Sequence, residues 1–219
     1  MAHPAAIVAA ELHILSVSVT RMSDDVEVLE KSPVYAGYLK VYRYRVRHRR
    51  HAGGMSDVVV RELIDRGNAV TVLPYDPLRD EVVLIEQFRI GAMGAGLAPF
   101  QVECVAGIID AGETPEQVAE RETMEEAGLR VRALARIGKT LLSPGVLSET
   151  ATMYCGWVDS AGADGIRGLP EEHEDIRVFA LPFAEAMRWL DDEKILLAPA
   201  IVSLLWLRMN RDTLRAKWR

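Results

Sequence analysis

The strongest structural signals in the sequence lie in GIIDAGETPEQVAERETMEEAGL, residues Gly107–Leu129. Local signals set the limits of a helix within it. Thr114 suits the N-cap position and starts a capping box with the glutamine three residues later, and Pro115 stands where a first-turn proline is tolerated. Gly128 suits the left-handed conformation that ends many helices. The stretch therefore predicts a helix from about Pro115 to Ala127.

Three carboxylates crowd one face of this predicted helix. Glu122 and Glu126 are four residues apart, and Glu125 lies between them on the same face. They repel one another by roughly a few tenths of a kcal/mol per pair, and the helix offers only Arg121, and no lysine, to offset this. Such a cluster is either a solvated acidic surface or a site for Mg²⁺, which prefers hard oxygen ligands.

The same stretch resembles the Nudix box, G-x5-E-x7-R-E-U-x-E-E-x-G-U, in which U is aliphatic. The specified positions that agree are Gly107, Glu113, Arg121, Glu122, Glu125, Glu126, Gly128 and Leu129. Thr123 departs from the pattern where an aliphatic residue is expected, which puts some helix packing in doubt but no ligand. By this resemblance we expect an α+β protein with the Nudix fold, a mixed β-sheet sandwiched by helices.

The box implies hydrolysis of a nucleoside diphosphate linked to another group. By the resemblance, Glu122 and Glu126 bind Mg²⁺ together with the backbone carbonyl of Ala106, and Mn²⁺ can take its place. Glu125 joins them directly or through water and belongs with the catalytic residues. Arg121, also counted as catalytic, orients the carboxylates. The first glutamate of the box is expected to be structural.

Outside the box, the chain resembles the bacterial ADP-ribose diphosphatases from about Tyr35 to its C-terminus. Pro144, 15 residues beyond the end of the box, is a mark of that subfamily. The other matching segments are YAGY, VRELIDRG, EQFRI, SPGVLSE and GLPEEHEDIRV. The resemblance implies that ADP-ribose is the substrate, and that AMP and ribose 5-phosphate are the products.

The acidic loop in GLPEEHEDIRV carries two of the implied functional residues. By the resemblance, Glu174 completes the metal site and Glu172 is the general base that activates the attacking water. A general base typically contributes ~10²–10⁴-fold to the rate. One alternative is a solvated surface turn, and another is a base placed one residue earlier, at Glu171.

Four further residues are implied to contact the substrate. Arg89 contacts the diphosphate, Arg61 and Glu149 recognise the terminal ribose, and Tyr38 stacks on adenine. Two of them have plainer alternatives, Arg89 as a strand-end salt-bridge partner and Tyr38 as a residue that packs on the sheet. Because family precedent has Tyr38 and Arg61 reach the partner subunit's site, we expect a homodimer with a domain-swapped N-terminal unit.

The chain is predicted to comprise a β-rich N-terminal dimerisation and substrate-binding domain, residues 1–66, and a Nudix hydrolase domain, residues 67–219. From about residue 24 to 67, apolar and polar residues alternate as in half-buried strands. In VYRYRVRHR the tyrosines share one face with Val46 and the arginines occupy the other, which is either a binding surface or a solvated face. HAGG should then turn into a strand over MSDVVVREL.

The second domain is predicted to mix strands with three helices. AVTVLPYDPLRDEVVLIEQFRI indicates two buried strands joined by a turn at Asp76-Pro77. Single strands are expected over FQVECVAGII, RALARIGKTLL, TATMYCGWV and DIRVFAL. Besides the helix of the box, FAEAMRWLDDEK and APAIVSLLWLRM show helical patterns.

Composition excludes several classes of partner. The net charge of −6 argues against nucleic acid, which would require a basic surface. Cys104 and Cys155 form no CxxC and are expected to be reduced, buried thiols. The opening MAHPAAIVAAELHILSVSVT lacks a basic n-region and is too short and polar for a membrane span, so we expect a cytoplasmic protein.

Two other functions stay open at this point. One is hydrolysis of another nucleotide sugar, such as GDP-mannose, on the same scaffold, and turnover of a substrate panel would separate the two. The other is a non-catalytic Nudix sensor that binds ADP-ribose and regulates transcription. Such sensors usually lose box carboxylates and carry a DNA-binding appendage, whereas this sequence keeps the carboxylates and shows no helix-turn-helix after the Nudix domain.

Overall fold

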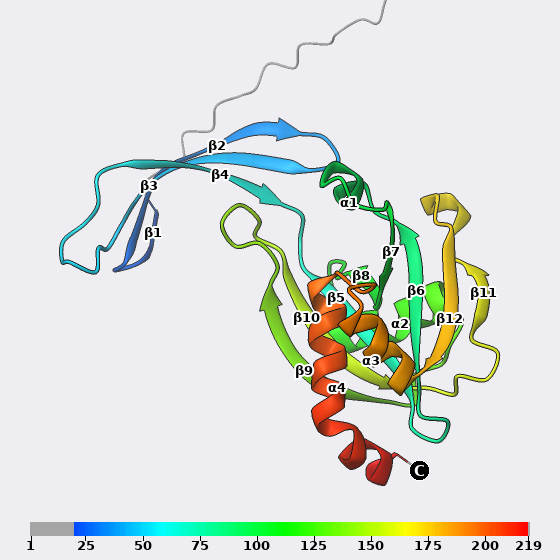
Figure 1. The fold of residues 1–219 in the computed structure, drawn as a ribbon. Coiled ribbons are helices and arrows are strands. Elements are labelled where there is room, and N and C mark those ends of the chain that lie inside the picture. Colours follow the sequence, from blue (N-terminus) through cyan, green and yellow to red (C-terminus); the bar gives the residue numbers. More distant parts are fainter. Residues whose placement is uncertain (1–19, 219) are drawn as a thin grey trace, which may run out of the picture. The chain divides into compact units, whose positions relative to one another are not determined.

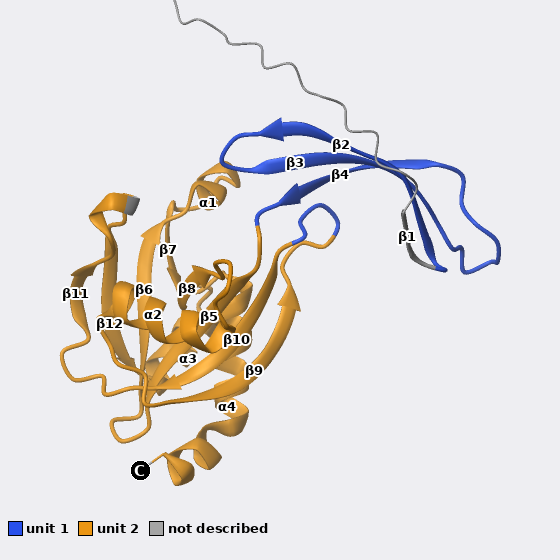
Figure 2. Ribbon diagram, turned by 180° about the vertical axis from the view of Figure 1, so that it is seen from behind, with its two compact units in different colours: residues 1–66, 145–148 blue, residues 67–144, 149–219 orange. Residues whose placement is uncertain are grey.

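The computed structural model describes residues 20–218, without the side chains of residues 20–23 and of Glu172. The opening segment, for which we predict neither a signal peptide nor a membrane span, lies outside the described residues apart from its last one. The chain forms two compact units (Figure 2). The first contains residues 1–66 and 145–148, and the second contains residues 67–144 and 149–219.

The first unit is an antiparallel sheet with strand order β1-β2-β3-β4. Its strands are β1 (Thr20–Ser23), β2 (Val26–Ala36), β3 (Lys40–His48) and β4 (Val59–Asp65). The predicted alternation of β3 is confirmed, because Tyr42, Tyr44 and Val46 are half-buried while the arginines between them are exposed. The arginine face is a solvated one with ion pairs, Arg43 to Glu62 at 3.2 Å and Arg45 to Glu30 at 3.3 Å.

Two features of this unit differ from the sequence-based expectation. The strand predicted over MSDVVVREL begins only at Val59, and Met55 forms an isolated bridge with Arg49. Residues 145–148 also join the unit from far along the chain. The Ile64 amide donates to the Val146 carbonyl at 2.8 Å, and the Ser148 amide donates to the Ile64 carbonyl at 3.1 Å. This loop therefore pairs with β4 like a short extra strand.

The second unit is built on an eight-stranded mixed sheet (Figure 1). Its main path is β11-β12-β6-β5-β10-β9, and only the β5–β10 pair is parallel. The strands are β5 (Ala69–Asp76), β6 (Glu81–Phe88), β7 (Phe100–Glu103), β8 (Val105–Ile108), β9 (Ala133–Leu141), β10 (Thr150–Trp157), β11 (Asp164–Arg167) and β12 (Ile176–Pro182). The helices are α1 (Ile90–Gly94), α2 (Pro115–Ala127), α3 (Phe183–Asp191) and α4 (Ala198–Lys217), and a 3₁₀ turn spans Pro170–Glu172.

Helices cover both faces of this sheet, as the Nudix fold predicts. One core cluster packs α3 and α4 against the sheet, and the other packs α2 against it. Strand β5 is buried along its whole length, with Leu73 and Tyr75 in the first cluster and Val70 and Val72 in the second. This even burial explains why its sequence is a continuous apolar run rather than an alternating one.

The single strand predicted over FQVECVAGII is wrong, because two short strands meet there. Strand β7 pairs with β6, and β8 pairs with β5. Two strands form there because β5 and β6 pair with each other only next to their hairpin turn, at Tyr75↔Val82 and Asp76↔Glu81. Beyond that point the segment 100–108 lies between them and changes partner at Cys104. Strand β8, which begins directly after Cys104, is thereby placed beside helix α2.

The remaining predicted strands and helices of the second unit are confirmed. Helix α4 continues to Lys217, and the short elements α1 and β11 were not predicted. Helix α1 has no side-chain N-cap and consists of IGAMG, so local signals for it are weak. Cys104 and Cys155 are buried free thiols. None of the helices within residues 20–218 is long and apolar enough to cross a membrane.

Candidate active site

Helix α2 begins and ends where its sequence signals predict. The Thr114 hydroxyl accepts from the Gln117 amide at 3.3 Å, and the Gln117 side chain accepts from the Thr114 amide at 2.8 Å. Pro115 occupies the first turn, and Gly128 has a left-handed φ of 68°. The capping box, the first-turn proline and the C-cap glycine are all confirmed.

Thr123, the one departure from the box pattern, packs into the core despite its hydroxyl. It is completely buried, and its Oγ1 donates to the Ala119 carbonyl one turn earlier at 2.7 Å. The hydroxyl is therefore satisfied within the helix, and the methyl group can face apolar neighbours. The doubt about packing at this position is resolved.

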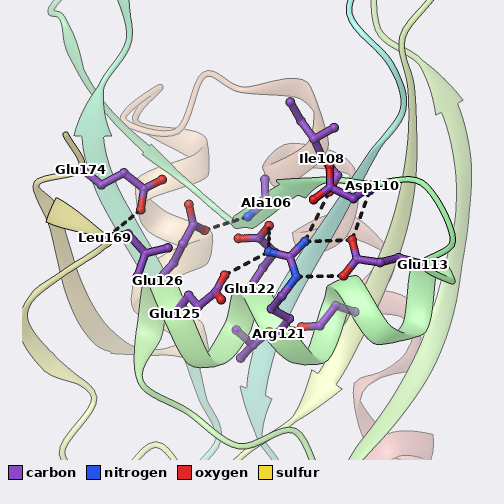
Figure 3. Close-up of polar contacts among 12 residues, drawn as sticks. Ala106, Ile108, Asp110, Glu113, Arg121, Glu122, Glu125, Glu126, Leu169 and Glu174 are labelled. Atoms are coloured by element: carbon purple, nitrogen blue, oxygen red, sulfur yellow. Dashed lines mark hydrogen bonds and ion pairs between the residues drawn. The ribbon is translucent and has the colours of Figure 1, made fainter. Parts of the chain in front are cut away.

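Arg121 joins the loop before α2 to the carboxylates on the helix (Figure 3). Its Nε and Nη2 donate to the two oxygens of Glu113 at 3.0 and 3.1 Å. Its Nη1 donates to Glu122 at 2.8 Å and to Glu125 at 3.0 Å. Glu113 also accepts from the Asp110 amide at 3.1 Å, so it braces the loop. The guanidinium thus fixes the directions of two helix carboxylates at once, as an orienting role requires.

Glu122 lies in a space that only a glycine at position 107 leaves open. A Cβ built on Gly107 would stand 1.8 Å from Oε1 of Glu122 and 2.0 Å from its Cδ. The side chain of Glu122 is only 14% exposed. Strand β8, which contains Gly107, therefore forms the wall against which this carboxylate rests.

Glu126 is the most deeply buried carboxylate of the helix, at 2% exposure. Its Oε2 accepts from the Ala106 amide at 2.9 Å, and its Oε1 lies 3.5 Å from the Nε2 of Gln87 on β6. Ala106, predicted to offer its carbonyl to a metal, is thus in direct contact with a predicted ligand. Gln87 was not predicted.

The electrostatics of this group favour a bound cation. Burial raises the pKa of Glu126 to about 8, against the hydrogen bond from Ala106, and repulsion by Glu122, Glu103 and Glu174 adds to the rise. Burial likewise raises the pKa of Glu122 to about 7, against the pull of Arg121. Buried carboxylates with raised pKa values are disfavoured as anions until a positive charge compensates them.

The acidic loop brings Glu174 to the same group of carboxylates. Its Oε2 accepts from the Leu169 amide at 3.0 Å, and its charge raises the pKa of both Glu122 and Glu126. Glu171 is exposed. The backbone of Glu172 ends the 3₁₀ turn, and its side chain lies outside the described residues. Its assignment as general base therefore stays a prediction.

Arg89 forms the salt bridge that was the alternative to a diphosphate contact. Its Nε and Nη2 donate to the two oxygens of Glu103 at 2.8 and 3.0 Å. Burial opposes the charge of Arg89, but the Glu103 carboxylate outweighs this and the pKa of Arg89 is raised. Its charge also interacts with Glu126 and Glu174, so it borders the carboxylate group. Glu103 was not predicted, although an acidic residue within an apolar strand was a signal.

The remaining predicted substrate contacts fall in different units. Glu149, in the second unit, is buried. Arg61 is exposed on β4 in the first unit, where its Nη1 donates to the Val60 carbonyl at 2.8 Å. Tyr38 is 87% exposed, so the alternative in which it packs on the sheet is wrong.

The donor set of this site suits a divalent cation. Glu122, Glu126 and Glu174 supply hard oxygen atoms, and the pKa values of the buried pair Glu122 and Glu126 stay raised despite the arginines nearby. In the arrangement described for residues 20–218, no three acidic, histidine or cysteine side chains converge closely enough to ligate one ion. Glu122 and Glu125 instead pair with Arg121.

The chain matches the model of the NUDIX domain over residues 65–199. It belongs to the NUDIX family and is a Nudix hydrolase. It is 43% identical over 200 residues to the ADP-ribose pyrophosphatase of Escherichia coli (strain K12), covering 91% of this chain and 96% of that one. The ADP-ribose pyrophosphatase of Haemophilus influenzae is 40% identical over 198 residues, covering 89% and 91%. A crystal structure of an ADP compounds hydrolase, 21% identical, shares the fold with a TM-score of 0.67 and covers 93% of this chain and 100% of that one.

Replacing Gly107 by alanine is expected to lower activity and metal affinity by ~10–100-fold, the usual cost of disturbing a ligand's support. The three atoms nearest to the added Cβ all belong to the flexible side chain of Glu122, so we expect that side chain to move while the fold persists. Titration of activity with Mg²⁺ and thermal unfolding measure the two effects.

Gly138→Ala is the matched control, because a Cβ there meets nothing within 4 Å. It should leave both the activity and the melting temperature near their original values. An active Gly107→Ala enzyme with normal metal dependence would show that the position of Glu122 is unimportant.

Proposed function

We propose that this enzyme hydrolyses the diphosphate of ADP-ribose to AMP and ribose 5-phosphate, with Mg²⁺ as cofactor and Mn²⁺ as a substitute. The proposal rests on the carboxylates of α2, held by Gly107 and Arg121, and on the similarity to ADP-ribose pyrophosphatases along nearly the whole chain. The intact box carboxylates favour an enzyme over a sensor.

The residues of the site have two roles, which are to hold the metal and to position the reactants. Glu122, Glu126, Glu174 and the Ala106 carbonyl would hold Mg²⁺, which neutralises charge on the phosphoryl oxygens and acidifies bound water. Arg121 keeps Glu122 and Glu125 in place.

Glu172 acts as the base. It removes a proton from water as the water oxygen attacks one phosphorus and the bond from that phosphorus to the bridging oxygen breaks. Its place in the acidic loop suits a group that closes over bound substrate. Arg89 lies at the border of the carboxylates, where it would counter the charge of the diphosphate.

Product analysis with ADP-ribose in ¹⁸O-labelled water tests this function. AMP and ribose 5-phosphate are expected, and the position of the label identifies the attacked phosphorus. Faster turnover of GDP-mannose in the same assay would favour the nucleotide-sugar alternative. Tight binding of ADP-ribose without turnover would instead support a sensor.

We further propose a cytoplasmic homodimer in which the first unit of one subunit completes the site of the other. Tyr38 and Arg61 would bind adenine and ribose there, with Glu149 contributing from the second unit. The exposure of Tyr38 leaves it available for such a contact.

A mixing experiment tests the shared site. Arg61→Ala should raise KM, and Glu172→Gln should lower kcat, so each variant is nearly inactive at low ADP-ribose concentration. In a heterodimer with exchanged units, one site contains both native residues, so equal mixing should restore roughly a quarter of native activity. Verified heterodimers without any recovery would exclude a shared site.

A further inference from the structure

A buried acid–base pair lies beside the carboxylates of the box but outside the box itself. Glu103 ends β7, and Arg89 directly follows β6. Both oxygens of the Glu103 carboxylate accept from the guanidinium, at 2.8 and 3.0 Å. The side chain of Glu103 is 5% exposed, whereas that of Arg89 is 36% exposed. The arginine thus reaches solvent while its partner does not.

Stability alone is a weak explanation for this pair. Burying a carboxylate is costly, and an apolar residue of similar volume in its place often gives an equal or more stable fold. Position 103 is opposite Ile85 in the β6–β7 register, on a face of the sheet that belongs to the core cluster with α2. An aliphatic side chain could pack there, so the carboxylate points to a role in holding Arg89.

The pair is also connected to the predicted metal ligands. Gln87 precedes Arg89 by two residues and contacts Glu126 at 3.5 Å. The Gln87 side chain also lowers the pKa of Glu103, so it lies close to that carboxylate as well. One buried amide therefore lies between the carboxylate that holds Arg89 and the carboxylate predicted to bind Mg²⁺. All of these residues belong to the second unit.

We propose that Glu103 is a positioning residue. It holds the Arg89 guanidinium toward the diphosphate and, through Gln87, fixes the position of that guanidinium relative to Glu126. Nη1 of Arg89 takes no part in the fork with Glu103. That nitrogen can donate to a phosphate oxygen while the other two stay bound to the protein. This inference rests on the proposed function, because it assigns the diphosphate to Arg89.

The expected effect follows from side-chain entropy. An arginine that is held before substrate arrives loses little freedom on binding, whereas an unheld one must be ordered by the substrate. Loss of Glu103 should therefore raise KM for ADP-ribose about two- to ten-fold, the equivalent of ordering one long side chain. The value of kcat should change less, because the box carboxylates remain in place.

The test compares two replacements of Glu103. Glu103→Gln keeps the volume and removes the charge, and Glu103→Asp keeps the charge but shortens the side chain so that the fork cannot form as before. Both replacements should raise KM, because the proposed role depends on the position of the Glu103 carboxylate and not on its charge alone. Calorimetry with the non-hydrolysable α,β-methylene analogue of ADP-ribose should show the same loss of affinity without turnover. If the glutamine variant does not fold, the aspartate variant carries the test.

Asp80→Asn supplies the matched control. Arg211 donates to both oxygens of Asp80 in a similar fork. Asp80 lies at the opposite end of β6, roughly 30 Å along the strand direction from Arg89. This variant should lower the melting temperature and leave KM unchanged. A melting temperature that falls in the Glu103 variants together with a native KM would reduce Glu103 to a structural residue and overturn the proposal.

A double replacement establishes that Glu103 acts through Arg89. In an Arg89→Gln background, Glu103→Gln should cause no further rise in KM, because the two residues work as one unit. A full additional rise would overturn the proposed route. If the native enzyme turns over no ADP-ribose yet binds the analogue, the proposed function fails, and the binding measurements still decide the role of Glu103.

Discussion

Replacing Glu126 by glutamine is expected to lower kcat/KM for ADP-ribose by at least ~100-fold, because the metal's stabilisation of transition-state charge is worth several kcal/mol. Glutamine keeps the volume of the side chain and an oxygen for the Ala106 amide. It removes an ionisable group whose charged form is disfavoured by burial and by repulsion from Glu122, Glu103 and Glu174. Without metal, the melting temperature of the variant should therefore equal or exceed that of the native enzyme.

Glu120→Gln is the control for this change, since Glu120 is an exposed residue of the same helix. It should alter neither the activity nor the response to Mg²⁺. Activity is measured across a Mg²⁺ titration, and unfolding is measured with and without EDTA. A Glu126→Gln protein that unfolds early but keeps its specific activity would contradict the metal site. The same outcome is expected, and the same test applies, for Glu122→Gln.

Replacing Glu172 by glutamine is expected to lower kcat by ~10²–10⁴-fold, the usual loss when a general base is removed. The Mg²⁺ concentration for half-maximal activity and the binding of substrate should stay nearly unchanged. Glu174→Gln should instead raise that Mg²⁺ concentration, because it removes a predicted ligand that lies among the carboxylates. Single-turnover rates and metal titrations of the two variants separate a base from a ligand.

Glu171→Gln completes this comparison, because Glu171 is exposed and adjacent to Glu172. We expect it to retain native kcat and metal dependence. An inactive Glu171→Gln enzyme beside an unaffected Glu172→Gln enzyme would move the base one residue earlier in the loop.

The local features of the site could be predicted from the sequence because their causes are local. The limits of α2 depend on Thr114, Pro115 and Gly128, and each acts within a turn of its own position. The clustering of Glu122 and Glu126 follows from helical spacing alone. Residue types at fixed intervals therefore sufficed to find the carboxylates.

The parts that were missed depend on pairings between distant segments. Glu103 meets Arg89 only because β7 pairs with β6 in one particular register. The division into β7 and β8 arises because β5 and β6 separate after their hairpin, which no pattern within residues 100–108 reveals. Residues 145–148 join the first unit through the backbone of Ile64, so side-chain patterns did not indicate it.

The pairing of residues 145–148 with β4 limits how the first unit could be deleted or exchanged. The chain passes between the units at three places, after residue 66, after residue 144 and after residue 148, rather than along one linker. Deleting residues 1–66 would strip the Val146 carbonyl and the Ser148 amide of their backbone partners on Ile64. Residues 1–66 therefore cannot be deleted without losing these hydrogen bonds. A chimera that takes this unit from a relative must also take the loop at 145–148.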